Sequence, residues 1–251
     1  MLTVSLYGLV LTVATMTRQS LMLQEELAAT LVHSSGIREE LRKLRKEFYT
    51  YKFNNGRLNG VRFLRIDFMN YATIKKNDIA NGPGIRVSLF VSGCRHRCKN
   101  CFNSEAWDFN YGKEFNDAVI GEIITALKPD YVEGISLLGG EPFEPENQEG
   151  LIKLLEKVRS ELPGKNVWCY TGFTFEKDLM NGSENARKLL SLIDVLVDGK
   201  FVEELKDASL IFRGSSNQNI IDVPKSLQAK STVLLAGTWK RKMGSTNIYD
   251  A

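Results

Sequence analysis

The sequence predicts an α/β fold with parallel strands. Three observations support this prediction. Short β-rich apolar runs alternate with segments of helical spacing, and each run ends in a glycine-containing turn. At 251 residues the chain is also long enough for one large α/β domain, or for one domain plus an appendage. Because parallel strands need long crossover connections, the helical segments are expected to supply right-handed ones.

The expected elements follow one another in a regular order. A strand over residues 87–92 leads into a cysteine-containing loop, and later strands are expected over residues 134–138, 167–170 and 195–197. The intervening helices are expected over residues 116–127, 147–162 and 186–192. The first carries one apolar side, and the second ends at a Pro-Gly pair. Loops after the carboxyl ends of parallel strands gather ligand sites. The loops at 93–102, 139–142, 170–172 and 198–199 should therefore share one mouth.

The densest chemical signal is a trio of cysteines, Cys94, Cys98 and Cys101, with three residues between the first two and two between the last two. A structural zinc site wants four protein ligands, whereas a cubane iron–sulfur cluster held by three cysteines keeps one iron open for chemistry. His96 makes a Cys3His zinc site an alternative. However, His96 is two residues from both Cys94 and Cys98, so all four groups would have difficulty converging on one ion.

A glycine-rich turn after the strand at 134–138 is the second candidate site. Gly139 and Gly140 would let a ligand approach the backbone, and the carboxylate of Glu141 could face a ligand ammonium. The alternative is a simple turn that begins a helix. Arg86, after the turn at 81–84, is a candidate anion or substrate contact, again with a plain turn as the alternative. Trp168 and Tyr170 are expected in the core.

Composition narrows the functional class. The formal net charge of +3 is too small to indicate nucleic-acid binding, so no nucleic-acid partner is expected. Only four cysteines occur, and three belong to the trio, which leaves Cys169 as an expected buried side chain. A secreted disulfide scaffold would spread more cysteines along the chain. We therefore expect a cytoplasmic protein whose thiols are reserved for metal.

Three regions are expected along the chain. Residues 1–68 form an N-terminal extension, with an apolar run over 1–16 and a basic amphipathic helix over 21–48. The extension is interpreted either as an upstream translation start or as a partner- or membrane-binding helix. The apolar run is short for a bilayer, so no stable membrane association is expected. It also lacks the positive leading region that a signal peptide would carry. Residues 69–225 form the main domain, and residues 226–251 form a basic tail or peripheral strand.

The motifs together resemble a known family. The Cys-x3-Cys-x2-Cys loop followed by Gly-Gly-Glu-Pro is similar to radical S-adenosylmethionine enzymes. The upstream Asn-Gly-Pro-Gly-Ile-Arg turn (81–86) narrows the resemblance to glycyl-radical activating enzymes. The strings at 195–201 and 212–218 resemble the activating proteins of anaerobic (class III) ribonucleoside-triphosphate reductases. The resemblance runs from about residue 69 to residue 223.

This resemblance implies a fold, cofactors and partners. The fold would be a partial, open (βα) barrel of the radical S-adenosylmethionine type. Cys94, Cys98 and Cys101 would hold a [4Fe–4S] cluster, and its open iron would bind S-adenosylmethionine. The reduced cluster would cleave the cofactor to a 5′-deoxyadenosyl radical, which takes a hydrogen from a glycine of the reductase. A low-potential electron donor such as flavodoxin is also implied.

The resemblance further assigns cofactor contacts. Gly139, Gly140 and Glu141 would meet the methionine end, while Asn100 and Phe102 would flank the cofactor. Many superfamily members carry an aromatic residue where this chain has Asn100, and the aromatic follows instead as Phe102. The extension over residues 1–68 also departs from the family pattern. Two alternatives remain: an activase of another glycyl-radical enzyme such as pyruvate formate-lyase, or a zinc-binding interaction module.

Overall fold

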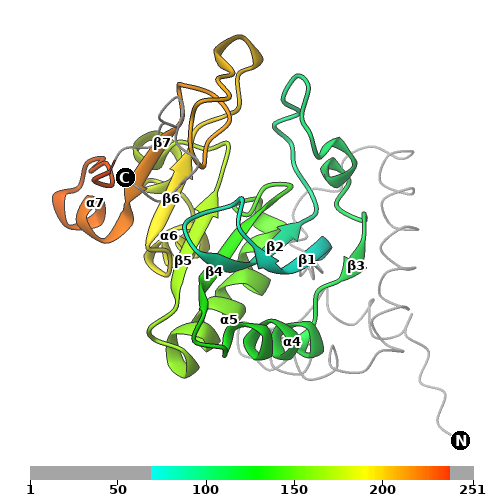
Figure 1. Cartoon of the computed structure of the whole chain (residues 1–251). Helices are drawn as coiled ribbons and strands as arrows, with labels where there is room; N and C mark the ends of the chain where they lie inside the picture. The colour runs from blue at the N-terminus through cyan, green and yellow to red at the C-terminus, as the bar shows by residue number, and fades with distance from the viewer. Residues whose placement is uncertain (1–68, 238–251) are drawn as a thin grey trace, which may run out of the picture. The chain divides into compact units, whose positions relative to one another are not determined.

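A computed structural model describes residues 69–237 of the chain, which contain one mixed sheet in the order β3-β1-β2-β4-β5-β6-β7 (Figure 1). Its middle is parallel and is formed by β2 (Ile85–Val91), β4 (Val132–Gly139), β5 (Asn166–Tyr170) and β6 (Val195–Asp198). The four expected strands are these four, with ends shifted by no more than two residues. The predicted α/β class is confirmed, and the described sheet is open.

The edges of the sheet are antiparallel, which corrects the expectation of parallel strands throughout. β1 (Asn70–Asp78) pairs with β2, β3 (Lys113–Glu114) pairs with β1, and β7 (Asn219–Asp222) pairs with β6. The pattern of apolar runs does not predict β1, because much of this strand is polar and exposed. An edge strand of this kind needs a partner to define it, and sequence periodicity alone does not show one.

Three helices join the parallel strands and cover one face of the sheet. They are α4 (Asp117–Leu127), α5 (Pro145–Glu161) and α6 (Glu184–Ser191), again within two residues of the expected bounds. The strand order β2, β4, β5, β6 advances in one direction, so right-handed crossovers place all three helices on the same side. The other helical segments within residues 69–237 are η2 (Ser104–Trp107), η3 (Phe175–Leu179), η4 (Glu203–Leu205) and α7 (Val223–Ala229).

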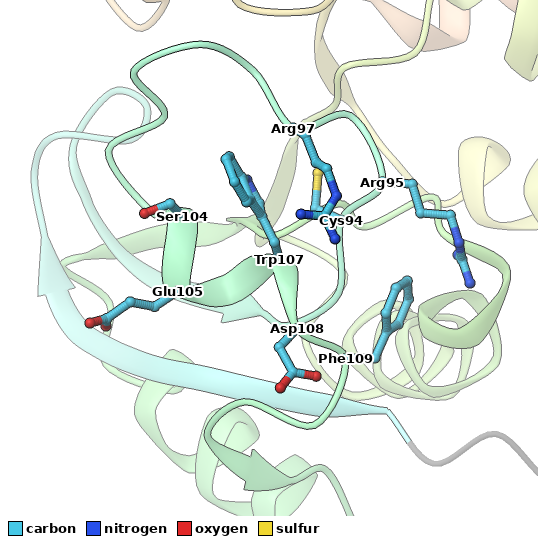
Figure 2. A pocket seen from close by; sticks show the side chains of 8 residues that line it. All are labelled: Cys94, Arg95, Arg97, Ser104, Glu105, Trp107, Asp108 and Phe109. Carbon is cyan, nitrogen blue, oxygen red and sulfur yellow. The ribbon is translucent and has the colours of Figure 1, made fainter. Parts of the chain in front are cut away.

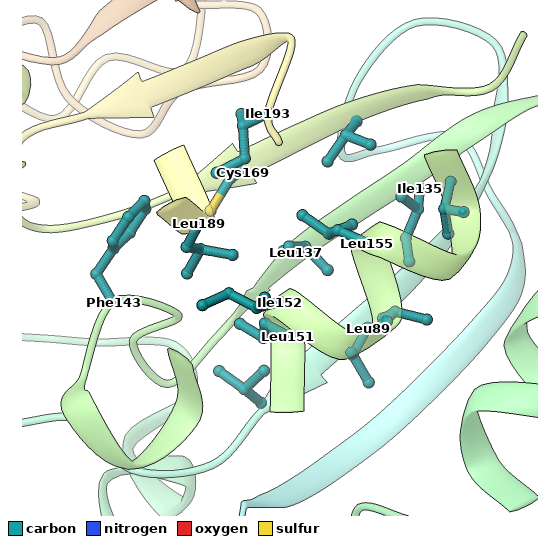
Figure 3. Close-up of a cluster of buried hydrophobic side chains, with 14 of the residues drawn as sticks. Leu89, Ile135, Leu137, Phe143, Leu151, Ile152, Leu155, Cys169, Leu189 and Ile193 are labelled. Atoms are coloured by element: carbon teal, nitrogen blue, oxygen red, sulfur yellow. The ribbon is translucent and has the colours of Figure 1, made fainter. Parts of the chain in front are cut away.

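Alternate residues of each central strand face the helices or face away from them. The helix-facing side chains form the main core, and Figure 3 shows part of it, including Leu89, Ile135, Leu137 and Cys169 against α5 and Leu189. The expected burial of Cys169 is confirmed. The opposite face carries a smaller cluster that includes Trp168, with Tyr170 packed against it, as expected of core residues.

Arg86 lies on that opposite face and has a structural role in place of the expected anion contact. Its side chain is fully buried, and its guanidinium donates to Ser136 Oγ at 2.7 Å and to the Ile135 carbonyl at 2.8 Å. The guanidinium carbon lies 5.7 Å from the Trp168 ring centroid. Burial lowers the pKa of Arg86 to about 10. Arg86 therefore ties β2 to β4 and β5 from within.

Several expectations concern residues outside the described range. The apolar run over 1–16, the helix over 21–48 and the basic cluster over 240–242 all lie there. Within the described range, α7 crosses the boundary expected at residue 225, and the segment after it hydrogen-bonds to β7, as a peripheral strand would (Asp222 N to the Val233 carbonyl, Leu235 N to the Ile220 carbonyl, both 2.9 Å). No helix among residues 69–237 has the length and hydropathy that crossing a membrane requires.

Replacing Arg86 should destabilise the sheet. In Arg86→Met the buried Ser136 hydroxyl and two strand carbonyls lose their donor, so we expect the free energy of unfolding to fall by about 3 kcal/mol. Urea denaturation of the full chain measures this. The control Arg187→Met changes an exposed arginine of α6 and should cost less than about 0.5 kcal/mol. Equal midpoints for the two variants would contradict the structural role.

Candidate functional site

Hydrogen bonds connect the loops at the carboxyl ends of the parallel strands, as expected if these loops form one site. Gly140 N donates to the Val91 carbonyl at 2.7 Å and Glu141 N to the Gly93 carbonyl at 2.8 Å, which connects the ends of β2 and β4. Thr171 N donates to the Val197 carbonyl at 3.0 Å, which connects β5 to β6. The cysteine loop and the three later turns therefore lie together at the end of the sheet where the parallel strands terminate.

The Glu141 carboxylate lies at the centre of this end of the sheet. Its side chain is 1% exposed. Oε1 accepts from Phe143 N at 2.9 Å and from Thr171 Oγ1 at 2.8 Å, and Oε2 accepts from Gly172 N at 2.8 Å and from His96 Nε2 at 3.0 Å. One buried anion thus binds the cysteine loop, its own turn and the turn after β5. The carboxylate expected to face a ligand ammonium is occupied here by four protein donors.

His96 belongs to this network and is engaged away from the thiols. Its ring nitrogen Nε2 pairs with Glu141, and its ring packs edge-on against Phe173 with centroids 4.6 Å apart. The hydrogen bond to Glu141 raises the pKa of His96. A Cβ on Gly172 would come within 2.6 Å of the His96 ring, so that glycine makes room for it. The structure gives His96 the role of a contact between loops, and it does not support the zinc-ligand alternative.

The two glycines before Glu141 are required by the packing of the turn. Gly139 has φ +111°, and a Cβ there would lie 2.7 Å from the Phe90 and Val91 backbone. A Cβ on Gly140 would lie 2.5 Å from the Gly93 carbonyl oxygen. Both positions therefore allow the turn to approach the start of the cysteine loop, in addition to any ligand that they admit.

The three cysteines of the loop are free thiols with different environments. Cys94 is buried, and burial raises the pKa of its thiol to about 11. Cys98 and Cys101 are partly exposed, and burial also raises the pKa of Cys98. Among the described residues, no three His, Cys, Asp or Glu side chains meet at a point that would hold one metal ion. The ligands of a four-iron cluster have no need to meet at a point, because each binds a different iron.

The three thiols fit an iron–sulfur cluster by donor chemistry and placement. Thiolates are the ligands that such clusters use, and this loop supplies three with no disulfide among the described cysteines. Cys94 is buried whereas Cys98 and Cys101 are partly exposed, so the loop can be reached from solvent. Cys169 lies on β5 and is buried in the main core, so it is not available as a fourth thiol ligand.

The expected cofactor-flanking residues sit on the exposed arc of the same loop. Asn100 is exposed with φ +56°, and Phe102 is 85% exposed. An aromatic side chain with so much free surface beside the thiols is available to a ligand or a partner. Their contacts with a cofactor stay predictions.

The loop after β6 closes the other side of the site. Phe201 N donates to the Cys98 sulfur, and the Lys200 charge is close enough to favour the Cys98 thiolate. The segment 212–218 holds this loop in place: Gln218 Nε2 donates to the Gly199 carbonyl at 2.9 Å and Ser215 Oγ accepts from Val202 N at 3.2 Å. Through these hydrogen bonds the segment 212–218 keeps Lys200 and Phe201 next to Cys98, which is far from them in the sequence.

A cavity of about 490 Å³ opens beside Cys94 (Figure 2). Arg95 and Arg97 lie along it, each over an aromatic ring of the following segment, Phe109 at 4.2 Å and Trp107 at 5.4 Å. The remaining lining residues are polar: Ser104, Glu105 and Asp108. Residue-type patterns missed Arg95, as well as the two buried acids that it contacts, Glu144 and Glu146. Three glutamates within six residues, directly after an apolar strand, were the available signal.

Comparisons with known proteins agree with this site. The family profile of the 4Fe-4S single cluster domain matches residues 80–221, more than half of the chain. Curated relatives named anaerobic ribonucleoside-triphosphate reductase-activating protein are found in bacteria and in a phage. The Escherichia coli K12 protein is 46% identical over 152 residues, which is 60% of this chain and 96% of the relative.

Two further relatives carry the same name. The Haemophilus influenzae protein is 42% identical over 154 residues, covering 61% of this chain and 97% of the relative. The Enterobacteria phage T4 protein is 38% identical over 154 residues, covering 61% of this chain and 93% of the relative. These similarities therefore extend over nearly the whole length of each relative.

If the Glu141 carboxylate organises the site, Glu141→Gln should lower the stability of the full chain. The amide would present its NH2 group to two donors in place of an acceptor, so we expect a loss of about 2–3 kcal/mol in the free energy of unfolding, measured in urea. The control Glu149→Gln makes the same change at an exposed site on α5 and should be near neutral. A carboxylate that only contacted a ligand would leave both variants equally stable in the absence of ligand.

Proposed function

The chain belongs to the family of anaerobic ribonucleoside-triphosphate reductase-activating proteins, and on that premise we propose that it generates the glycyl radical of such a reductase. The observation that carries this proposal is the placement of three free thiols beside the Gly139–Gly140 turn at the mouth of the sheet. The family relationship adds the cofactors, a [4Fe–4S] cluster and S-adenosylmethionine. When bound, they supply reductive cleavage of a carbon–sulfur bond to a 5′-deoxyadenosyl radical.

The chain's own residues would bind and orient these groups. We assign Cys94, Cys98 and Cys101 as the cluster ligands, and we assign Gly139, Gly140, Asn100 and Phe102 to the S-adenosylmethionine side. Glu141 acts in this assignment by shaping the turn, because its carboxylate oxygens already accept four hydrogen bonds. The burial of Cys94 would limit water at that thiol, while the partial exposure of Cys98 and Cys101 would admit a segment of a partner protein.

We further infer that the sheet and its helices represent a partial barrel of the radical S-adenosylmethionine type. Supporting this, α4, α5 and α6 all cover one face, whereas a doubly wound sheet has helices on both faces. The opposite face carries the polar side chains Arg86, Ser88 and Ser136, which is unusual for a sheet that packs only on a core. An open side suits a substrate that is a segment of another protein.

Other expectations join the proposal. A low-potential donor such as flavodoxin would reduce the cluster, in a cytoplasmic setting without nucleic acid or stable membrane association. The activase domain would comprise residues 69–225, preceded by the extension over 1–68 and followed by the tail over 226–251. The alternatives are less well supported. The 4Fe-4S family match speaks against a zinc module, and the names of the relatives speak against activation of pyruvate formate-lyase.

Removing one cluster thiol should abolish cluster binding. After anaerobic reconstitution, Cys98→Ala should lose most of the roughly four irons per chain found in the parent protein, and with them S-adenosylmethionine cleavage on reduction. Cys169→Ala is the matched control: its thiol lies in the core, so iron content should be unchanged. Stoichiometric zinc in place of iron in the parent protein would refute the assignment.

The choice of partner is tested by radical formation. The reconstituted protein, incubated with S-adenosylmethionine, a reductant and an anaerobic ribonucleoside-triphosphate reductase, should produce a glycyl radical detectable by electron paramagnetic resonance. The same mixture with pyruvate formate-lyase should produce none. A radical on pyruvate formate-lyase alone would move the protein to the alternative activity.

A further inference from the structure

We propose that Arg95 is a positioning residue that fastens the cysteine loop to Glu144 and Glu146 at the start of α5, and thereby sets the position of Cys94. This inference rests on the proposed function, because it deepens the account of the same loop. Arg95 lies between Cys94 and Cys98, at a position for which the Cys-x3-Cys-x2-Cys spacing specifies no residue type. The proposal assigns a role to this position.

The contacts of Arg95 are numerous and directional. Its guanidinium meets both oxygens of Glu146, with Nη2 to Oε1 at 2.6 Å and Nη1 to Oε2 at 3.0 Å, and Nη1 also contacts Glu144 Oε2. The backbone N–H of Arg95 donates to Glu144 Oε1 at 2.7 Å. The side chain therefore holds both acids and the main chain also holds Glu144, while the paired contact with Glu146 fixes the orientation of the guanidinium plane.

The burial of the two acids shows that the contact is more than a surface ion pair. The side chains of Glu144 and Glu146 are 4% and 7% exposed, whereas that of Arg95 is 54% exposed. A buried carboxylate is costly unless it is paired and hydrogen-bonded. The start of α5 favours negative charge, but two neighbouring buried anions also repel each other. Arg95, which relieves this repulsion, comes from the cysteine loop. Glu144 and Glu146 therefore form the site at which that loop binds to the start of α5.

The contacts of Arg95 with Glu144 and Glu146 restrict the position of Cys94 in particular. Arg95 directly follows Cys94, whose own N–H donates to the Trp107 carbonyl at 3.2 Å, while Gly93 N donates to the Ala106 carbonyl at 2.8 Å. The Arg95 guanidinium also lies over the Phe109 ring, at 4.2 Å from its centroid, and both residues line the same cavity as Cys94 (Figure 2). Cys94 is therefore held from both sides. Cys98 and Cys101 lie in the following part of the loop, where Arg97 and Asn100 have positive φ angles.

The first test uses the metal-free full chain. In Arg95→Gln the contacts with Glu144 and Glu146 are lost, so we expect iodoacetamide to alkylate Cys94 about tenfold faster, because a local opening that costs about 1.4 kcal/mol less is ten times more populated. Alkylation of Cys98 and Cys101, read by peptide mass spectrometry, should change little. Lys99→Gln is the matched control, because it removes one positive charge from the same loop but breaks only an exposed pair with Glu204.

The second test uses the reconstituted protein. Arg95→Gln should release iron to a chelator about tenfold faster than the parent protein or Lys99→Gln. It should also alter the change that S-adenosylmethionine causes in the electron paramagnetic resonance spectrum of the reduced cluster. Arg95→Lys should restore both properties only in part, since an ammonium cannot match two carboxylate oxygens as a guanidinium does.

A triple variant separates positioning from plain stability. Arg95→Gln should lower the melting temperature, because it removes the arginine that pairs with two buried carboxylates. Adding Glu144→Gln and Glu146→Gln removes these buried charges, so the melting temperature should recover while Cys94 alkylation and iron release stay fast. Recovery of all three together would overturn the inference, as would parental alkylation and release rates in Arg95→Gln. Absence of a cluster in the parent protein would instead refute the proposed function, and the alkylation rates would still decide the role of Arg95.

Discussion

The arrangement of the site depends on one buried anion, the carboxylate of Glu141. It accepts hydrogen bonds from the cysteine loop, from its own turn and from two groups of the turn after β5. A carboxylate this deeply buried is stable only while those donors stay in place, and each donor is in turn held by the carboxylate. The relative positions of three loops therefore depend on a single charge.

Glu141 is the first of three buried acids along the strand–turn–helix segment that ends β4 and begins α5. Glu141 receives His96, while Glu144 and Glu146 receive Arg95, so adjacent residues of the cysteine loop dock onto one continuous acidic segment. The thiols of Cys98 and Cys101 stay partly exposed, and Gly93, next to Cys94, accepts a hydrogen bond from Glu141 N at the glycine turn. The arrangement fixes Arg95 and His96, which lie between the first two cysteines, through contacts with buried acids.

Residue patterns predicted a good part of this protein. The alternation of apolar runs and helical spacing placed the four central strands and three helices within two residues of their ends, because local periodicity reflects which side of an element is buried. It missed β1 and β7, whose pairing is antiparallel and whose burial depends on a neighbour. The cysteine trio stood out because three thiols at short spacing suit a metal cluster, and Gly139–Gly140 gained weight from its position after an apolar strand. Arg86 was misread, since an arginine in a strand is seldom fully buried.

The sequence by itself determined the α/β class, the central elements and the group of thiols, because each of these depends on the spacing of residues that are close together in the chain. Only the tertiary structure decided the roles of Glu141, His96 and Arg95. Each of them acts through a partner some 30 to 50 residues away, and a buried charge has no meaning until its partners are known. Local chemistry therefore indicated where the site is, whereas long-range pairing between charges decided how it is held.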